Sequence, residues 1–173
     1  MAIVTAELRS GTQVTMQARQ FTWRGDEPPA VGGTDTGPTP YEILLGSLAA
    51  CITVTLRLYA DHKGIDLTGI DVTLEFDRVH ADDCVDCDQR KDGWIDRIQT
   101  RVVIRGTFDD AQKTRLAQVA GRCPVHKTLA NGVEIFDSVT FEEAAESDSS
   151  PSPPPGTPSR PGRAFNSTKG ATT

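Results

Sequence analysis

The chain has 173 residues, a formal net charge of −6 and 37% hydrophobic residues. An acidic chain argues against nucleic-acid binding, because contacts to a phosphate backbone need a basic face. The first residues, MAIVTAELRSG, lack the basic start and apolar core of a signal peptide. Glu42 and Arg57 bound the longest uncharged apolar run, which is too short to span a membrane. We therefore expect a soluble, cytoplasmic protein that binds neither nucleic acid nor membrane, with its cysteines reduced unless they act in redox chemistry.

Composition divides the chain into two parts. Residues 147–173 are rich in Pro and Ser, contain almost no aliphatic residues and carry a net charge of about +2. Such a segment cannot bury enough apolar surface to offset its ordering entropy, so we predict a disordered tail. Residues 1–146 have the length of one domain.

The N-terminal residues predict a hairpin. Residues 2–9 (AIVTAELR) and 12–24 (TQVTMQARQFTWR) are rich in β-branched and aromatic side chains, and a Ser-Gly pair joins them. Residues 25–38 contain many Gly and Pro residues and are predicted to form a loop.

A long helix is predicted from residue 40 to about residue 63. Thr39 can act as the N-cap, Pro40 as the first helical residue, and Glu42 completes a capping box. Gly64 provides a left-handed stop. Apolar side chains lie on nearly every face between residues 43 and 59, so the helix must be covered on all sides. We infer that a partner subunit supplies part of this cover.

The rest of the domain continues with strands and shorter helices. We predict strands at residues 68–80, 94–108 and 133–141, and helices at 111–122 and 123–130. The order ββ-α-ββ-αα-β indicates an α+β fold, in which antiparallel sheets wrap a long buried central helix.

Two cysteines lie at helical positions that matter chemically. Cys51 lies inside the apolar run, where a free cysteine is either a core side chain or a reactive thiol, and periodicity alone leaves both interpretations open. Cys123 lies at the start of a later helix, beside Arg122 and near His126. Backbone N–H groups and the helix dipole favour a thiolate there, so Cys123 favours redox function for the pair.

The segment GPTPYEILLGSLAAC, followed about 70 residues later by RCPVHKTL, resembles the OsmC/Ohr superfamily of hydroperoxide-reducing thiol proteins. HADDCVDC and LRLYADHKG further resemble its YhfA-like branch. The resemblance covers residues 1–146 and implies an intertwined homodimer, with two sheets around paired central helices.

The resemblance also implies a two-step reaction. Cys51 would attack an organic hydroperoxide and become a sulfenic acid, and Cys123 would resolve it as a disulfide. A dithiol reductant, for which a lipoyl protein is a candidate, would restore the thiols. This activity serves oxidative-stress defence, and the apolar helix around Cys51 would favour alkyl hydroperoxides over hydrogen peroxide.

The family pattern includes an arginine from the N-terminal hairpin, oriented by a glutamate. Arg9 fits the arginine position best and Arg24 is the reserve candidate. Relatives carry the glutamate ten residues before the reactive cysteine, where this chain has Tyr41. Glu42 lies one helical position further round, which puts the arginine–glutamate pair in doubt.

A second candidate site lies in the acidic segment HADDCVDC. His80, Cys84 and Cys87 have a spacing that suits zinc, with Asp83, Asp86 or water as a fourth ligand. The two cysteines could instead form a redox dithiol, or be plain exposed thiols.

Two functions follow from these residues. We predict a homodimeric, cysteine-based organic hydroperoxide reductase with Cys51, Cys123, Arg9 and Glu42 as site residues and no required cofactor. The alternative is a non-peroxidase, metal- or ligand-binding OsmC-like protein that uses the His80, Cys84 and Cys87 segment.

Overall fold

The fold was analysed in a computed structural model that describes residues 1–80 and 93–141. The chain divides into two units, Met1–Ile135 and Phe136–Thr173. In the second unit the described residues 136–141 contain neither helix nor strand, and Phe136 and Phe141 are exposed. The predicted start of the disordered tail, at residue 147, lies outside the described residues.

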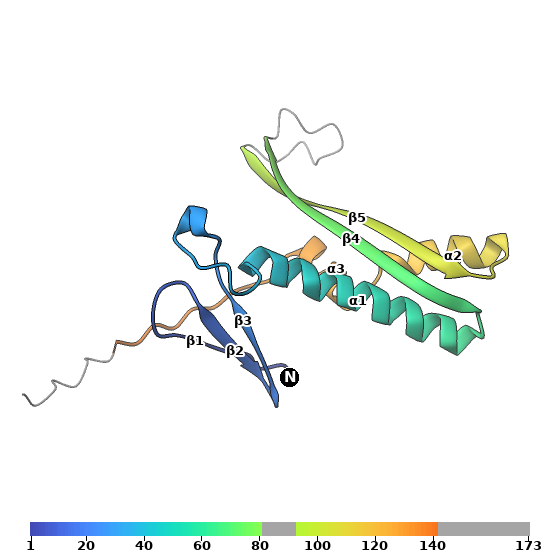
Figure 1. The fold of residues 1–173 in the computed structure, drawn as a ribbon. Coiled ribbons are helices and arrows are strands. Elements are labelled where there is room, and N and C mark those ends of the chain that lie inside the picture. Colours follow the sequence, from blue (N-terminus) through green and yellow to red (C-terminus); the bar gives the residue numbers. More distant parts are fainter. Residues whose placement is uncertain (81–92, 142–173) are drawn as a thin grey trace, which may run out of the picture. The chain divides into compact units, whose positions relative to one another are not determined.

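A three-stranded antiparallel sheet opens the first unit. Its strands β1 (Thr5–Leu8), β2 (Val14–Ala18) and β3 (Phe21–Gly25) follow one another in chain order (Figure 1). The strand predicted at 12–24 is thus two strands, because the chain turns after Ala18, where Arg19 adopts a left-handed φ of 54°. A short 3₁₀ helix, η1 (Pro29–Val31), lies in the predicted loop.

Asp26 organises the loop that connects β3 to the long helix. Its side chain is buried, and one carboxylate oxygen accepts hydrogen bonds from the Thr12 hydroxyl (2.6 Å) and the Glu27 N–H (2.8 Å). The other accepts from the N–H and the hydroxyl of both Thr34 and Thr36, at 2.6–3.1 Å. The hydroxyls of Thr12 and Thr34 do most to hold the pKa of Asp26 far below its usual range. The carboxylate therefore ties the β1–β2 turn to the loop that leads into the helix.

Helix α1 (Pro40–Lys63) begins and ends where the sequence predicts. The Thr39 hydroxyl accepts the Glu42 N–H, the Glu42 carboxylate accepts the Thr39 N–H (2.8 Å), and Gly64 ends the helix at φ 63°. Side chains four residues apart form its buried stripe: Leu48, Ile52, Leu56 and Ala60. That spacing keeps them on one side of the helix.

The opposite side of α1 is uncovered within the described residues. Ala50 is exposed, and Val54 and Leu58 are 55% and 64% exposed. By length and composition alone α1 could cross a membrane, a test that the core helix of a soluble domain also passes. Here one side of the helix forms the core, and an apolar strip faces outward.

Strands β4 (Leu67–His80) and β5 (Trp94–Gly106) form a long antiparallel pair, and α1 packs against β4 (Figure 1). The face toward the core carries alternate residues of both strands: Ile70, Val72, Leu74, Ile98, Val102 and Ile104. The opposite face carries polar side chains, among them the ion pair between Arg97 and Asp77 at 3.1 Å. The two-residue period of a strand accounts for this division.

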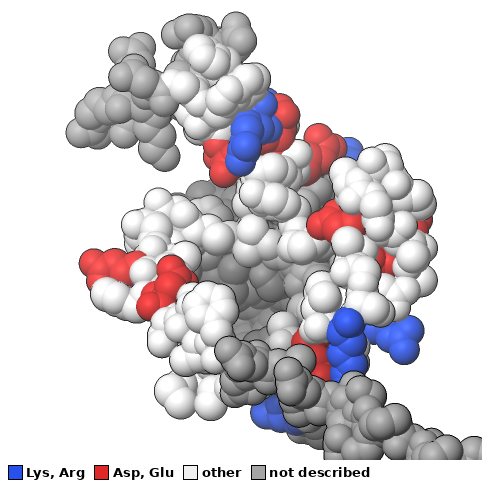
Figure 2. All heavy atoms as spheres, turned by 90° about the vertical axis from the view of Figure 1, so that its left-hand side faces the viewer, with Lys and Arg blue, Asp and Glu red and all other residues white. Residues whose placement is uncertain are grey.

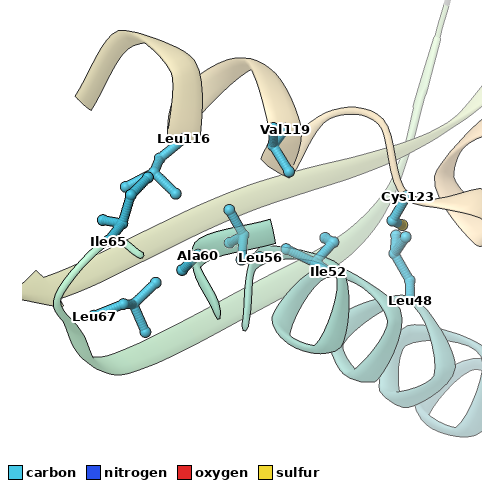
Figure 3. Packing of buried hydrophobic residues seen from close by; sticks show 9 residues of the cluster. All are labelled: Leu48, Ile52, Leu56, Ala60, Ile65, Leu67, Leu116, Val119 and Cys123. Atoms are coloured by element: carbon cyan, nitrogen blue, oxygen red, sulfur yellow. The ribbon is translucent and has the colours of Figure 1, made fainter. Parts of the chain in front are cut away.

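Two helices complete the first unit. Helix α2 (Asp110–Ala120) has Asp109 as its N-cap, and α3 (Pro124–Asn131) has Cys123 as its N-cap. Both helices contact α1. Leu116, Val119 and Cys123 join the stripe of α1 in one core cluster, which Figure 3 shows in close-up.

The fold is therefore α+β with antiparallel sheets, as predicted, apart from the C-terminal strand. Residues 133–141 form no strand, and Val133 and Ile135 are 67% and 75% exposed. A strand needs a hydrogen-bonding neighbour, and the described residues of this segment have none in either sheet.

Asp26→Asn should lower the melting temperature by several degrees at pH 7, because an amide cannot accept all the hydrogen bonds that the carboxylate accepts. A carboxylate whose folded pKa is depressed stabilises the fold above its unfolded pKa of about 4. The difference in stability between wild type and variant should hold from pH 5 to 7 and shrink below pH 4. Thermal melts across this range, with the exposed Asp35→Asn in the same loop as the control, check this, and a difference that grows on acidification contradicts it.

Candidate active site

The structure brings Cys51 and Cys123 together. Cys51 is half-buried on α1 and packs against the core cluster, whereas Cys123 is fully buried at the start of α3. Both thiols are free, and the Cys51 thiol is a close enough neighbour of Cys123 to raise its pKa. Figure 3 shows Cys123 at the Leu48 end of the core cluster. Residues 72 positions apart thus form one dithiol site at the junction of two helices.

The Cys123 sulfur is the N-cap acceptor of α3. The His126 N–H donates to it at 3.3 Å. Burial raises the pKa of Cys123, the His126 N–H opposes this, and the neighbouring Cys51 thiol raises the pKa further. The net shift is upward, so the resting form is the thiol. Deprotonation of Cys123 therefore needs help from another group.

A pocket of about 230 Å³ lies beside the dithiol. Its walls are largely apolar, and its polar lining side chains include Asp96 of β5 and His126 of α3. The residues that line it are Leu48, Asp96, Ile98, Thr100, His126, Leu129 and Ala130. Neither cysteine lines it, but Leu48 packs in the cluster that contains Cys123 and the His126 main chain bonds to the Cys123 sulfur, so the pocket lies next to residues that contact Cys123. The pocket can hold a small molecule whose apolar part contacts the apolar walls and whose polar end lies near Asp96 and His126.

Glu42 is held at the start of α1. Its carboxylate accepts hydrogen bonds from the N–H and the hydroxyl of Thr39, which together lower its pKa. It precedes Cys51 by nine residues, which is about 14 Å along a helix axis. Within the described chain Glu42 is a capping residue and does not reach the sulfurs.

Tyr41 joins a cluster that the sequence analysis missed. Its ring stacks on Phe76 with centroids 4.3 Å apart, and Arg78 beside it pairs with Asp96 at 2.8 Å. The hydrogen bond to Asp96 does most to raise the pKa of Arg78, and Tyr41 adds to it. The sequence signal for this cluster was the two-residue period of a strand, because Arg78 continues the series of core-facing residues that includes Leu74 and Phe76. The Arg78 guanidinium is therefore linked, through its ion pair with Asp96, to the pocket beside the dithiol.

Arg9 and Arg24 lie together at the N-terminal sheet. Both line a pocket of about 160 Å³, and Arg9 pairs with Glu7 at 2.8 Å. The side chains of that pair are 83% and 61% exposed. In the described residues Arg9 thus contacts a glutamate of its own strand hairpin and neither cysteine.

Acidic and basic side chains lie in small groups on the surface. On the face drawn in Figure 2, Lys and Arg side chains form small separate groups, some of them next to acidic ones. Exposed ion pairs of the described chain include those of Arg105 with Asp71 and Lys113 with Asp110. Exposed pairs of this kind contribute little to stability.

The predicted metal site lies largely outside the described residues. Cys84 and Cys87 are not among them, whereas His80 ends β4 and meets the Trp94 ring edge-on with centroids 5.5 Å apart. Within residues 1–80 and 93–141, no group of three or more potential ligands is arranged to hold a metal ion.

Comparison with known proteins identifies a family. The family model described as OsmC-like protein matches residues 33–136, which is more than half of the chain. A comparison with curated sequences finds no match. Similar solved structures include an OsmC-like protein from Mycoplasma pneumoniae, with 24% identity, a TM-score of 0.59, and coverage of 75% of this chain and 87% of that one.

Two further similar structures are described as organic hydroperoxide resistance proteins. The protein from Legionella pneumophila has 18% identity, a TM-score of 0.54, and coverage of 75% of this chain and 88% of that one. The protein from Elizabethkingia anophelis has 16% identity, a TM-score of 0.52, and coverage of 76% and 89%. At these identities the likeness establishes the fold.

Proposed function

Because this chain belongs to the OsmC-like protein family, we propose that it reduces organic hydroperoxides with Cys51 and Cys123 as its reacting sulfurs. The observation that carries the proposal is the packing of the half-buried Cys51 against the core cluster that contains the fully buried Cys123. A core that needed only small apolar side chains would not require two neighbouring sulfurs at a helix start. Two structural relatives described as organic hydroperoxide resistance proteins add support.

The reaction has two steps and a recovery. The Cys51 thiolate attacks the distal peroxide oxygen, the O–O bond breaks, and the leaving alkoxide takes a proton to become the alcohol. The Cys123 sulfur then attacks the Cys51 sulfenic acid, which forms a disulfide and releases water. An external dithiol reduces that disulfide by exchange and is itself oxidised to a disulfide. A lipoyl group is a dithiol of this class.

The pocket beside the dithiol favours an alkyl substrate. Leu48, Ile98 and Leu129 give it apolar walls, which can hold the organic part of a hydroperoxide. Hydrogen peroxide gains nothing from such walls. Alkyl hydroperoxides should therefore react faster than hydrogen peroxide.

Arg9 remains our proposed cation for the Cys51 thiolate. Its ion pair with Glu7 is largely exposed, and such a pair is weak enough to exchange for another partner. We propose that the working form is a homodimer, since the exposed strip of Ala50, Val54 and Leu58 needs a cover that the described chain does not supply. A second copy can bring both that cover and a hairpin arginine.

Cys51→Ser should abolish the consumption of cumene hydroperoxide, since the oxygen of serine is a far weaker nucleophile than a thiolate. Cys123→Ser should still react once but lose multiple turnover at limiting reductant, because no second sulfur resolves the sulfenic acid. Peroxide consumption with dithiothreitol measures both effects, and Ser47→Ala, an exposed residue of the same helix, is the control. Full turnover in Cys51→Ser, or equal rates with hydrogen peroxide in wild type, contradicts the proposal.

Val54→Arg should convert the dimer into monomer, because a charged side chain would be buried in the apolar interface. Light scattering coupled to size-exclusion chromatography reports the mass. Val103→Arg is the matched control, since Val103 is 43% exposed on β5 and away from α1. A wild-type monomer, or a Val54→Arg dimer as tight as wild type, rules out an interface along this strip.

A further inference from the structure

Two helices of the described chain begin with a capping box, in which the N-cap and N3 residues bond to each other. In α1 the N-cap is Thr39 and the N3 residue Glu42, and the Glu42 side chain returns to the Thr39 N–H. In α2 the Gln112 side chain returns to the Asp109 N–H at 3.0 Å. In both helices the N3 side chain therefore folds back over the N-cap residue.

Helix α3 has reactive side chains at the same two positions. Its N-cap is Cys123, and its N3 residue is His126, whose N–H donates to the Cys123 sulfur at 3.3 Å. Among the described contacts the imidazole makes no hydrogen bond back to Cys123, but the N3 position is the one from which a side chain can reach the N-cap. The imidazole is half-buried and lines the pocket beside the dithiol.

The second chemical step needs a proton carrier at this place. Cys123 is fully buried and must lose a proton to attack, while the hydroxyl that leaves Cys51 must gain one. Water has little access to a sulfur with no exposed surface. An imidazole, with an ordinary pKa of about 6.5, can accept and return a proton near neutral pH.

We propose that His126 transfers the proton of the second step. Its neutral imidazole takes the proton from the Cys123 sulfur as the S–S bond forms, and gives it to the hydroxyl that leaves the Cys51 sulfur as water. The hydrogen bond from the His126 main-chain N–H to the Cys123 sulfur holds this residue beside the reacting atom. This inference rests on the proposed peroxide reduction and assigns a residue to its second step.

Few charges face this histidine. Asp96 of β5 lines the same pocket but is paired with Arg78 at 2.8 Å, and Cys51 of α1 is the other titratable neighbour of Cys123. On its own element His126 is flanked by Arg122 before the helix and Lys127 within it. The carboxylate among the residues that line this pocket is therefore already engaged in an ion pair.

The test follows the sulfenic acid in His126→Gln and in the control His62→Gln, which changes an exposed histidine at the far end of α1. Each protein receives one equivalent of cumene hydroperoxide, and dimedone traps the sulfenic acid for mass spectrometry at set times. We expect the sulfenic acid to form within about twofold of the wild-type rate in both variants. Its decay at pH 7 should slow at least about tenfold in His126→Gln and stay unchanged in His62→Gln.

A second variant separates chemistry from folding. In His126→Ala, added imidazole should restore part of the lost rate, because it can enter the space that the side chain leaves. Decay at the wild-type rate in His126→Gln overturns the inference, and so does a slow decay in His126→Ala that added imidazole does not rescue. If wild type forms no sulfenic acid on Cys51, the proposed function fails and this assignment fails with it.

Discussion

The packing of one side of α1 against the β4–β5 pair and helices α2 and α3 is the constraint on which the rest depends. Leu48, Ile52 and Leu56 recur every four residues and are almost completely buried, so the helix can face the core in only one rotation. That rotation sets Cys51 at the edge of the buried stripe, where it meets Cys123 at the start of α3. A one-residue change in this register would turn Cys51 by about 100° and separate the sulfurs.

Burial and reactivity oppose each other at this pair. A dry site protects a sulfenic acid from further oxidation, yet it also raises the pKa of Cys123 and keeps the sulfur protonated. The His126 N–H at the start of α3 lowers the pKa of Cys123 and offsets part of this rise. A base for Cys123 and a cation for Cys51 would supply the remaining compensation, and we propose His126 and Arg9 for these two roles.

Patterns among neighbouring residues predicted the long helix and the long strands well. They could not predict contacts between residues that are far apart in the chain. The capping box and Gly64 fixed α1, and alternating side chains fixed β4, because both patterns lie within a few residues of each other. The loop network around Asp26 joins threonines up to 14 positions away, so no short pattern indicates it. The strand predicted at 133–141 needs a neighbour from elsewhere. Likewise, the partnership of Cys51 with a distant cysteine followed from the family resemblance alone.

The proximity of the two sulfurs is tested most directly by peptide mapping after one equivalent of an alkyl hydroperoxide. Non-reducing proteolysis and mass spectrometry identify which cysteines have become joined. This account predicts a peptide that links Cys51 to Cys123 within one chain, and its loss on reduction with a dithiol. A product in which Cys84 and Cys87 are joined while Cys51 and Cys123 stay reduced would contradict it.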